Sequence, residues 1–142
     1  MRFKVILNWI MCLSLFFCLS AEPTYAASGK TVKVKVTFVS AELQENNHVG
    51  NEWYTGLKVN GSEIGEGTGK TFTLKPNVSL KVEAIAEEQD KIPDTGSDTM
   101  TIKASSIKKT ADKSLSVTVT ENRGRYSGNT ATWKFVVKVQ KQ

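Results

Sequence analysis

The sequence predicts an all-β protein, an antiparallel β-sandwich of eight strands that follows an N-terminal secretory signal. Apolar and polar residues alternate with a period of two in most segments, and clusters of Gly, Asn, Asp, Ser or Pro separate those segments. No long window has the 3.6-residue periodicity of an amphipathic helix. The chain has 142 residues, of which 39% are hydrophobic and 23% are charged. This composition excludes disorder and collagen and favours one globular domain.

The first 26 residues have the pattern of a secretory signal peptide. Two basic residues precede an apolar run from Val5 to Leu19, which is too short to cross the ~30 Å hydrocarbon core of a bilayer. Small residues follow, and we expect cleavage near Ala26, which leaves residues 27–142 as one secreted domain without a transmembrane segment. Cys12 and Cys18 both lie in the signal, so packing and backbone hydrogen bonds have to stabilise the mature chain.

The alternating segments indicate where the strands lie. In the first segment, valines and Phe38 occupy every second position from Val32, with lysine or threonine between them. In the last, the same pattern begins at Trp133 and ends at Val139. Such strands bury one face and expose the other. The further segments of this kind are Trp53 to Val59, Phe72 to Leu74, Leu80 to Ala86, Met100 to Ile102 and Leu115 to Val119.

The connecting segments contain turn-forming residues. The Asn60-Gly61 pair favours the positive φ angles of a type I′ hairpin turn, and a short return strand at Ile64 completes the set of eight strands. Residues Gly65 to Gly69 are predicted to form a flexible hairpin connection. Two other segments, Ala41 to Asn46 and Ile107 to Asp112, each have a composition suited to a single helical turn.

Acidic residues concentrate near the middle of the chain. Six acids lie between Glu83 and Asp98, with Lys91 as the only base among them. Carboxylates held in one loop repel each other, and a hard divalent cation would cancel that repulsion, with amide and backbone carbonyl oxygens as further ligands. Calcium is therefore the candidate ion for this loop. A solvated acidic loop without a ligand is the alternative.

The order of residue types from about residue 31 to residue 104 resembles the scheme of C2 domains. The similar positions include Trp53-Tyr54, Gly69-Lys70-Thr71 and Glu88-Gln89-Asp90. The resemblance implies an eight-stranded antiparallel sandwich whose loops at one end bind calcium and, through it, phospholipid. An immunoglobulin-like sandwich is the alternative arrangement. Carried over by position, the expected metal-binding residues are Asn47, Glu52, Glu88, Asp90 and Asp94.

Basic residues concentrate in the last third of the chain. From Thr99 onwards there are nine bases and two acids. Such an excess attracts polyanions, and we expect an anionic cell-wall polymer or a lipid surface as the partner. Aromatic residues are sparse among these bases, so sequence-specific recognition of nucleic acid is not expected. Charges that only solvate the outward faces are the alternative. The expected polyanion-binding residues are Lys108, Lys109, Arg123 and Arg125.

The signal and the lack of cysteine in the mature chain resemble secreted proteins of Gram-positive bacteria. A single histidine, His48, lies in a polar loop, so nucleophilic catalysis with a histidine base is not indicated. We expect a small, secreted, non-enzymatic binding protein of the cell envelope or extracellular matrix, with calcium as its expected ion. Two alternatives remain open. One is a hydrolase that uses the carboxylates of Glu52, Glu87 and Glu88, and the other is a toxin or inhibitor whose Arg123 to Asn129 loop binds a protein partner.

Overall fold

The computed structural model describes residues 30–142, so the predicted signal peptide and the cleavage site near Ala26 lie outside the described residues. Eight β-strands and two single-turn 3-10 helices make up this part of the chain. The elements are β1 (Val32–Asn46), β2 (Trp53–Val59), β3 (Ser62–Ile64), β4 (Gly69–Leu74), β5 (Ser79–Glu88), β6 (Asp94–Lys103), η1 (Ala104–Ser106), β7 (Thr110–Thr120), η2 (Gly124–Tyr126) and β8 (Thr130–Lys141).

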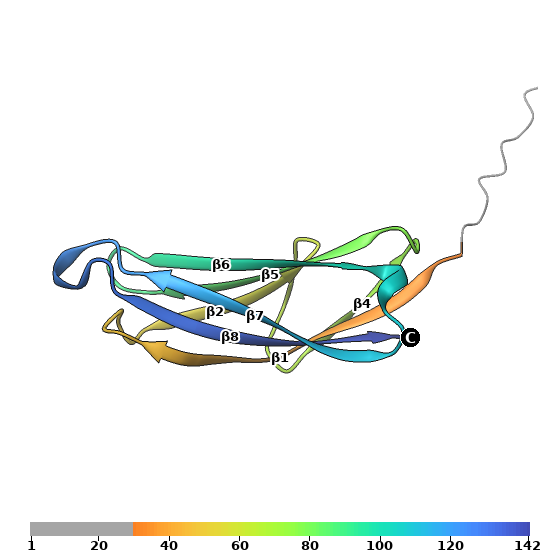
Figure 1. The fold of residues 1–142 in the computed structure, drawn as a ribbon, viewed down its shortest axis with the longest axis horizontal. Helices are drawn as coiled ribbons and strands as arrows, with labels where there is room; N and C mark the ends of the chain where they lie inside the picture. The colour runs from red at the N-terminus through yellow and green to blue at the C-terminus, as the bar shows by residue number, and fades with distance from the viewer. Residues whose placement is uncertain (1–29) are drawn as a thin grey trace, which may run out of the picture.

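Two four-stranded antiparallel sheets pack face to face, which confirms the predicted β-sandwich (Figure 1). One sheet has the strand order β4-β1-β8-β7, and the other has the order β3-β2-β5-β6. The shortest strand, β3, lies at an edge of the second sheet. At the opposite edges, β6 and β7 belong to different sheets and contact each other across the sandwich.

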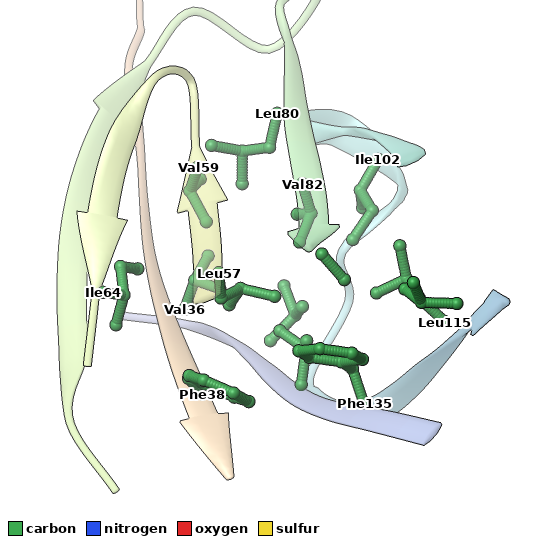
Figure 2. Packing of buried hydrophobic residues seen from close by; sticks show 14 of the residues in the cluster. Val36, Phe38, Leu57, Val59, Ile64, Leu80, Val82, Ile102, Leu115 and Phe135 are labelled. Atoms are coloured by element: carbon green, nitrogen blue, oxygen red, sulfur yellow. The ribbon is translucent and has the colours of Figure 1, made fainter. Parts of the chain in front are cut away.

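Side chains from the inner faces of both sheets form one hydrophobic core. Because successive residues of a strand point to opposite faces, the alternating valines of β1 and β8 are directed into this core. The rings of Phe38 and Phe135 stack there with centroids 5.7 Å apart. Figure 2 shows Leu57 of the opposite sheet above these two rings. Full burial stabilises by roughly 1.5–3 kcal/mol per large apolar side chain, which accounts for a stable core without disulfide bonds.

The structure confirms the predicted turn at Asn60-Gly61. The two residues have φ angles of 49° and 78°, as a type I′ turn requires, and they join β2 to β3. The backbone N–H of Asn60 also donates to the carbonyl oxygen of Lys81 over 2.9 Å. The hairpin is thereby joined to β5 at the centre of its sheet.

Neither of the two expected helical turns occurs at its predicted place. Residues Ala41 to Asn46 continue β1, because they pair with β8, with Ala41 opposite Phe135 and Leu43 opposite Trp133. In the second case, Ile107 to Asp112, the single turn η1 lies earlier in the chain and β7 already begins at Thr110. Pairing with a neighbouring strand therefore outweighs the weak local helical preference in both segments.

The predicted hairpin connection at Gly65 to Gly69 is wrong. This segment leaves β3 in one sheet and enters β4 in the other, so it crosses between the layers. It is also held against β1: the N–H of Gly67 donates to the carbonyl oxygen of Phe38 over 2.8 Å, and the N–H of Phe38 donates to the carbonyl oxygen of Thr68 over 3.0 Å. Sequence patterning finds turn residues but does not identify the sheet that follows them.

Connections between strands gather at both ends of the sandwich, whereas the connection of residues 65–68 lies beside Phe38, in the interior of β1. Three of them, residues 47–52, 89–93 and 121–129, gather at the left end of Figure 1, which we call the loop end. The opposite end, which we call the terminal end, carries the C-terminus and the connection of residues 104–109. Among residues 30–142, no helix has the length and apolar character needed to cross a membrane.

Candidate functional site at the loop end

A cavity of about 540 Å³ opens between the three connections of the loop end. Three of its lining residues are acids, two are aromatic or heteroaromatic, and no lysine or arginine from the described part of the chain lines it. Its volume falls within the range of small-molecule binding sites. The lining residues are Asn46, His48, Val49, Gly50, Asn51, Glu88, Asp90, Glu121 and Tyr126.

Glu88 is the buried acid of this cavity. It is the last residue of β5 and continues the inward-facing alternation of that strand, so the residue is only 4% exposed. The Oε2 atom accepts a hydrogen bond from the backbone N–H of Asp90 over 3.1 Å. The Oε1 atom lies so close to Gly50 that a Cβ atom at this position would overlap it. Gly50 also has a φ of 103°, a conformation that glycine adopts without strain.

The pKa of Glu88 is raised above its ordinary value of 4.5. Burial is the main cause, because it disfavours the charged carboxylate. The negative charges of Asp90, Glu121 and Asp94 raise the pKa further, and the hydrogen bond from the backbone of Asp90 opposes the shift. The ionised form of Glu88 is therefore destabilised, and a bound positive charge would stabilise it.

Asp94 is also buried, with 5% of its surface exposed, but its carboxylate is used within the fold. The Oδ1 atom accepts a hydrogen bond from Asn122 Nδ2 over 2.7 Å, and Oδ2 accepts one from the Asn122 backbone N–H over 3.3 Å. These bonds connect the start of β6 in one sheet to the connection that follows β7 in the other. Asp94 therefore fixes the position of the loop that contributes Glu121 and Tyr126 to the cavity.

The first connection is held in place by the side chain of Asn46. Its Oδ1 atom accepts from the N–H of Val49 over 2.9 Å, and its Nδ2 atom donates to the carbonyl oxygen of Gly50 over 2.7 Å. His48 lies between these contacts with a φ of 60°, and its ring stacks on Tyr126 with centroids 5.3 Å apart. The stacking joins the first and third connections across the mouth of the cavity.

The five predicted metal-binding residues do not all contribute to one site. Glu88 and Asp90 line the cavity, and the charge of Asp94 acts on Glu88. By contrast, Asn47 and Glu52 are exposed and do not line it; the side chain of Asn47 contacts His48, and Glu52 uses its backbone carbonyl to accept from Gln89. Within residues 30–142, no group of three or more His, Cys, Asp or Glu side chains is arranged to hold a metal ion.

The acids considered for a hydrolase are directed to different parts of the molecule. Glu87 and Glu88 are adjacent in β5, so they point to opposite faces of the sheet. On the outer face, Glu87 Oε2 accepts a hydrogen bond from Thr95 Oγ1 over 3.2 Å. The two carboxylates therefore do not face a common substrate position.

The four predicted polyanion-binding residues lie at opposite ends of the sandwich. Lys108 and Lys109 precede β7 at the terminal end, whereas Arg123 and Arg125 follow β7 at the loop end. The eleven residues of β7 separate the two pairs by roughly 35 Å. At the loop end, the guanidinium carbon of Arg125 lies 5.8 Å from the ring centroid of Tyr126. The four side chains therefore do not form one basic patch.

The cavity is also lined by residues that were not among the predicted metal ligands, and these include His48, Glu121 and Tyr126. The direction of the strands is the information that would have predicted that these residues lie close together. In antiparallel sheets, connections that follow strands of the same direction lie at the same end, and this applies to the connections after β1, β5 and β7. Sequence alone indicates the strands but not their directions across two layers.

Comparison with known proteins finds no matching family model and no matching curated protein. The chemistry of the loop end therefore has to be inferred from the arrangement of its own residues.

Proposed function

We propose that the protein is a secreted, non-enzymatic binding protein whose loop end binds a positively charged ligand. The observation that carries this proposal is the buried carboxylate of Glu88 in the wall of a cavity that two further acids line. A buried carboxylate among like charges is costly unless a positive charge accompanies it. A cationic ligand would supply that charge and would lower the pKa of Glu88 when it binds.

The dimensions of the cavity favour an organic cation, such as an amine or a basic side chain of a partner protein. A volume of about 540 Å³ exceeds what one metal ion needs. Tyr126 is an exposed aromatic residue at the same cavity, and aromatic rings attract cations through their π-electrons. The third connection, which carries Tyr126, is also the loop that the alternative hypothesis of a toxin or inhibitor assigned to a protein partner.

Calcium is the second candidate for the same cavity. The acidic side chains of Asp90 and Glu121 and the amide of Asn51 line it together with Glu88, and calcium prefers six to eight oxygen ligands of these types. Since no preformed group of three acids holds a metal within residues 30–142, a calcium site would require the loops to move closer together.

Action outside the cell is proposed from the predicted signal sequence. The cell envelope and the extracellular matrix are rich in charged polymers and in basic or amine-containing molecules, which suit a protein that binds cations. The divergent directions of Glu87 and Glu88 support a binding role over carboxylate-based hydrolysis.

Thermal unfolding with added cations tests the proposal. The purified protein is heated with calcium, with magnesium, with 1,5-diaminopentane or with a chelator, all at one ionic strength. A ligand present at a hundred times its Kd stabilises the native state by ~2.7 kcal/mol, which raises Tm by several degrees for a domain of this size. A shift with the diamine supports the organic cation, and a shift with calcium alone supports the metal.

Two variants locate the site. Asp90→Asn combined with Glu121→Gln removes two charges from the cavity and should abolish the shift. Glu42→Gln combined with Glu63→Gln removes two exposed charges that do not line the cavity, and this variant should keep the shift. If no cation raises Tm, or if the cavity variant retains the full shift, the proposed function is wrong.

A further inference from the structure

A second cavity, of about 530 Å³, lies at the terminal end between β6 and β7. It is surrounded by the last residues of β6, the turn after η1 and the first residues of β7. Its chemistry differs from that of the loop end because three lysines line it and no acid from the described part of the chain does. The lining residues are Thr101, Ile102, Ser106, Ile107, Lys108, Lys109, Thr110, Ala111, Lys113 and Val139.

The apolar part of this cavity consists of core side chains. Ile102, Ile107 and Val139 are almost fully buried, and each also lines the cavity. Val139 belongs to β8 and Ile102 to β6, so the cavity reaches the space between the two sheets. A ligand that enters it would contact the edge of the hydrophobic core.

Lys113 occupies a position of β7 that belongs to the inner face of its sheet. Lys113 pairs with Val137. It lies two positions before Leu115, which pairs with Phe135, so both side chains belong to the same face of the sheet. Val137, Leu115 and Phe135 are buried, whereas Lys113 is exposed in the cavity. A charged residue at an inner-face position is uncommon in a sandwich, where these positions are normally apolar.

Among residues 30–142, no carboxylate lies within 4.0 Å of the three lysine ammonium groups. Among the described residues, one ion pair is found within 4.0 Å. It lies on β5, where Lys81 Nζ is 3.8 Å from Glu83 Oε2. The ammonium groups of Lys108, Lys109 and Lys113 are therefore available to an anion from outside. The hydroxyls of Thr101 and Thr110 on the same cavity wall can donate further hydrogen bonds to it.

We propose that this cavity binds a single-chain anionic amphiphile, with its apolar chain on Ile102, Ile107 and Val139 and its carboxylate among the three lysines. Lysine beside an apolar surface suits such a molecule because the apolar part leaves water while the charge remains paired. The volume is that of a small-molecule site, which favours one chain over a phospholipid with two. This site is independent of the proposed function, because it lies at the opposite end of the sandwich.

Calorimetric titration of the purified protein with sodium dodecanoate below its micelle concentration tests this proposal. We expect saturable binding of one molecule per protein. Lys113→Met, which keeps the length of the side chain but removes its charge, should weaken binding by about tenfold, as expected for the loss of a charge-assisted contact. Lys134→Met, on the outer face of the same sheet, is the matched control and should leave the affinity unchanged.

A second variant distinguishes binding inside the cavity from binding to basic residues on the surface. Ala111→Trp fills the cavity and keeps all three lysines, so it should abolish binding of dodecanoate if the chain enters. Circular dichroism and Tm of each variant verify that the fold is intact. The proposal is overturned if dodecanoate does not bind or if Ala111→Trp binds it normally. It is also overturned if inorganic polyphosphate or anionic vesicles displace dodecanoate completely and decanol, which has an apolar chain without the charge, does not bind.

Discussion

At the scale of single residues, Glu88 and Gly50 depend on each other. The carboxylate fits against the backbone of Gly50 only because that residue has no Cβ, and the glycine in turn allows the first connection to turn back over β5. Burial of Glu88 in this position raises its pKa. A strand of alternating apolar residues thus ends in a buried acid, where another apolar residue would have been expected to continue the core.

The raised pKa of Glu88 predicts how stability depends on pH in the absence of ligand. Below the ordinary value of 4.5, the carboxyl is protonated in both the folded and the unfolded chain. As the pH rises, the unfolded chain loses its proton first, so the contribution of Glu88 to stability is lost as the pH passes through its raised native pKa. Glu88→Gln should remove this loss and be more stable than the parent protein near neutral pH.

Urea unfolding at a series of pH values from 4 to 8 measures this effect. This range includes the ordinary pKa of a carboxyl group and extends above it, where the raised pKa of Glu88 acts. Glu87→Gln is the matched control, because the neighbouring carboxylate lies on the outer face of the sheet. The control should keep the fall in stability with pH. A parallel pH dependence in the parent protein and Glu88→Gln would contradict the assignment.

At the scale of elements, β6 and β7 close one side of the sandwich. A Cβ atom at Gly96 of β6 would overlap the carbonyl oxygen of Thr118 in β7, so glycine is required for this close approach. Two residues further along β6, Asp98 Oδ2 accepts a hydrogen bond from the N–H of Ser116 over 3.1 Å. Two edge strands from different sheets are thereby held together, and their free backbone groups are partly satisfied.

Gly96→Ala is expected to push β6 away from β7 and to destabilise the protein by about 1–3 kcal/mol, because the added methyl group meets backbone that cannot rotate away. Chemical denaturation measures the loss. Gly65→Ala provides the control, since its nearest neighbour, a Thr68 side-chain atom, would lie 3.6 Å from the added Cβ. Equal stability of Gly96→Ala and the parent protein would show that the two strands can separate without cost.

At the scale of the whole molecule, one core connects two ends with opposite chemistry. The loop end carries an acidic cavity, and the terminal end carries a lysine-lined one. Both depend on the same sandwich, because β5, β6, β7 and β8 each run from one end to the other. Loss of core packing should therefore affect the stability of the molecule as a unit, whereas substitutions in one cavity should leave the other unchanged.

Phe135→Ala tests the first of these statements. The side chain is fully buried and stacks on Phe38, so its truncation should destabilise the protein by about 3–5 kcal/mol. Tyr126→Ala removes an aromatic residue of the loop end that is 45% exposed and stacks on His48, so it should lower the free energy of unfolding by only about 0.5–1.5 kcal/mol, the value of an aromatic pair. Urea unfolding compares the two variants, and similar losses would contradict the position of the core.

Part of this architecture was predictable because the underlying signals are local. Val32 to Phe38 and Trp133 to Val139 alternate with the period of a strand, and Asn60-Gly61 has the residue types of a type I′ turn. Glu88, Asp90 and Asp94 are near each other in the chain, so their proximity in the fold was also predictable. Such features depend on neighbours within a few residues.

The remaining features depend on how the strands are ordered across two layers. Glu121 and Tyr126 join Glu88 because β5 and β7 run toward the same end, and Lys108 is distant from Arg123 because the length of β7 lies between them. The sequence by itself determined a sandwich of alternating strands, since each strand has to bury one apolar face. Only the tertiary structure decided which charges share a cavity, because that depends on strand order and direction, which local side-chain patterns do not encode.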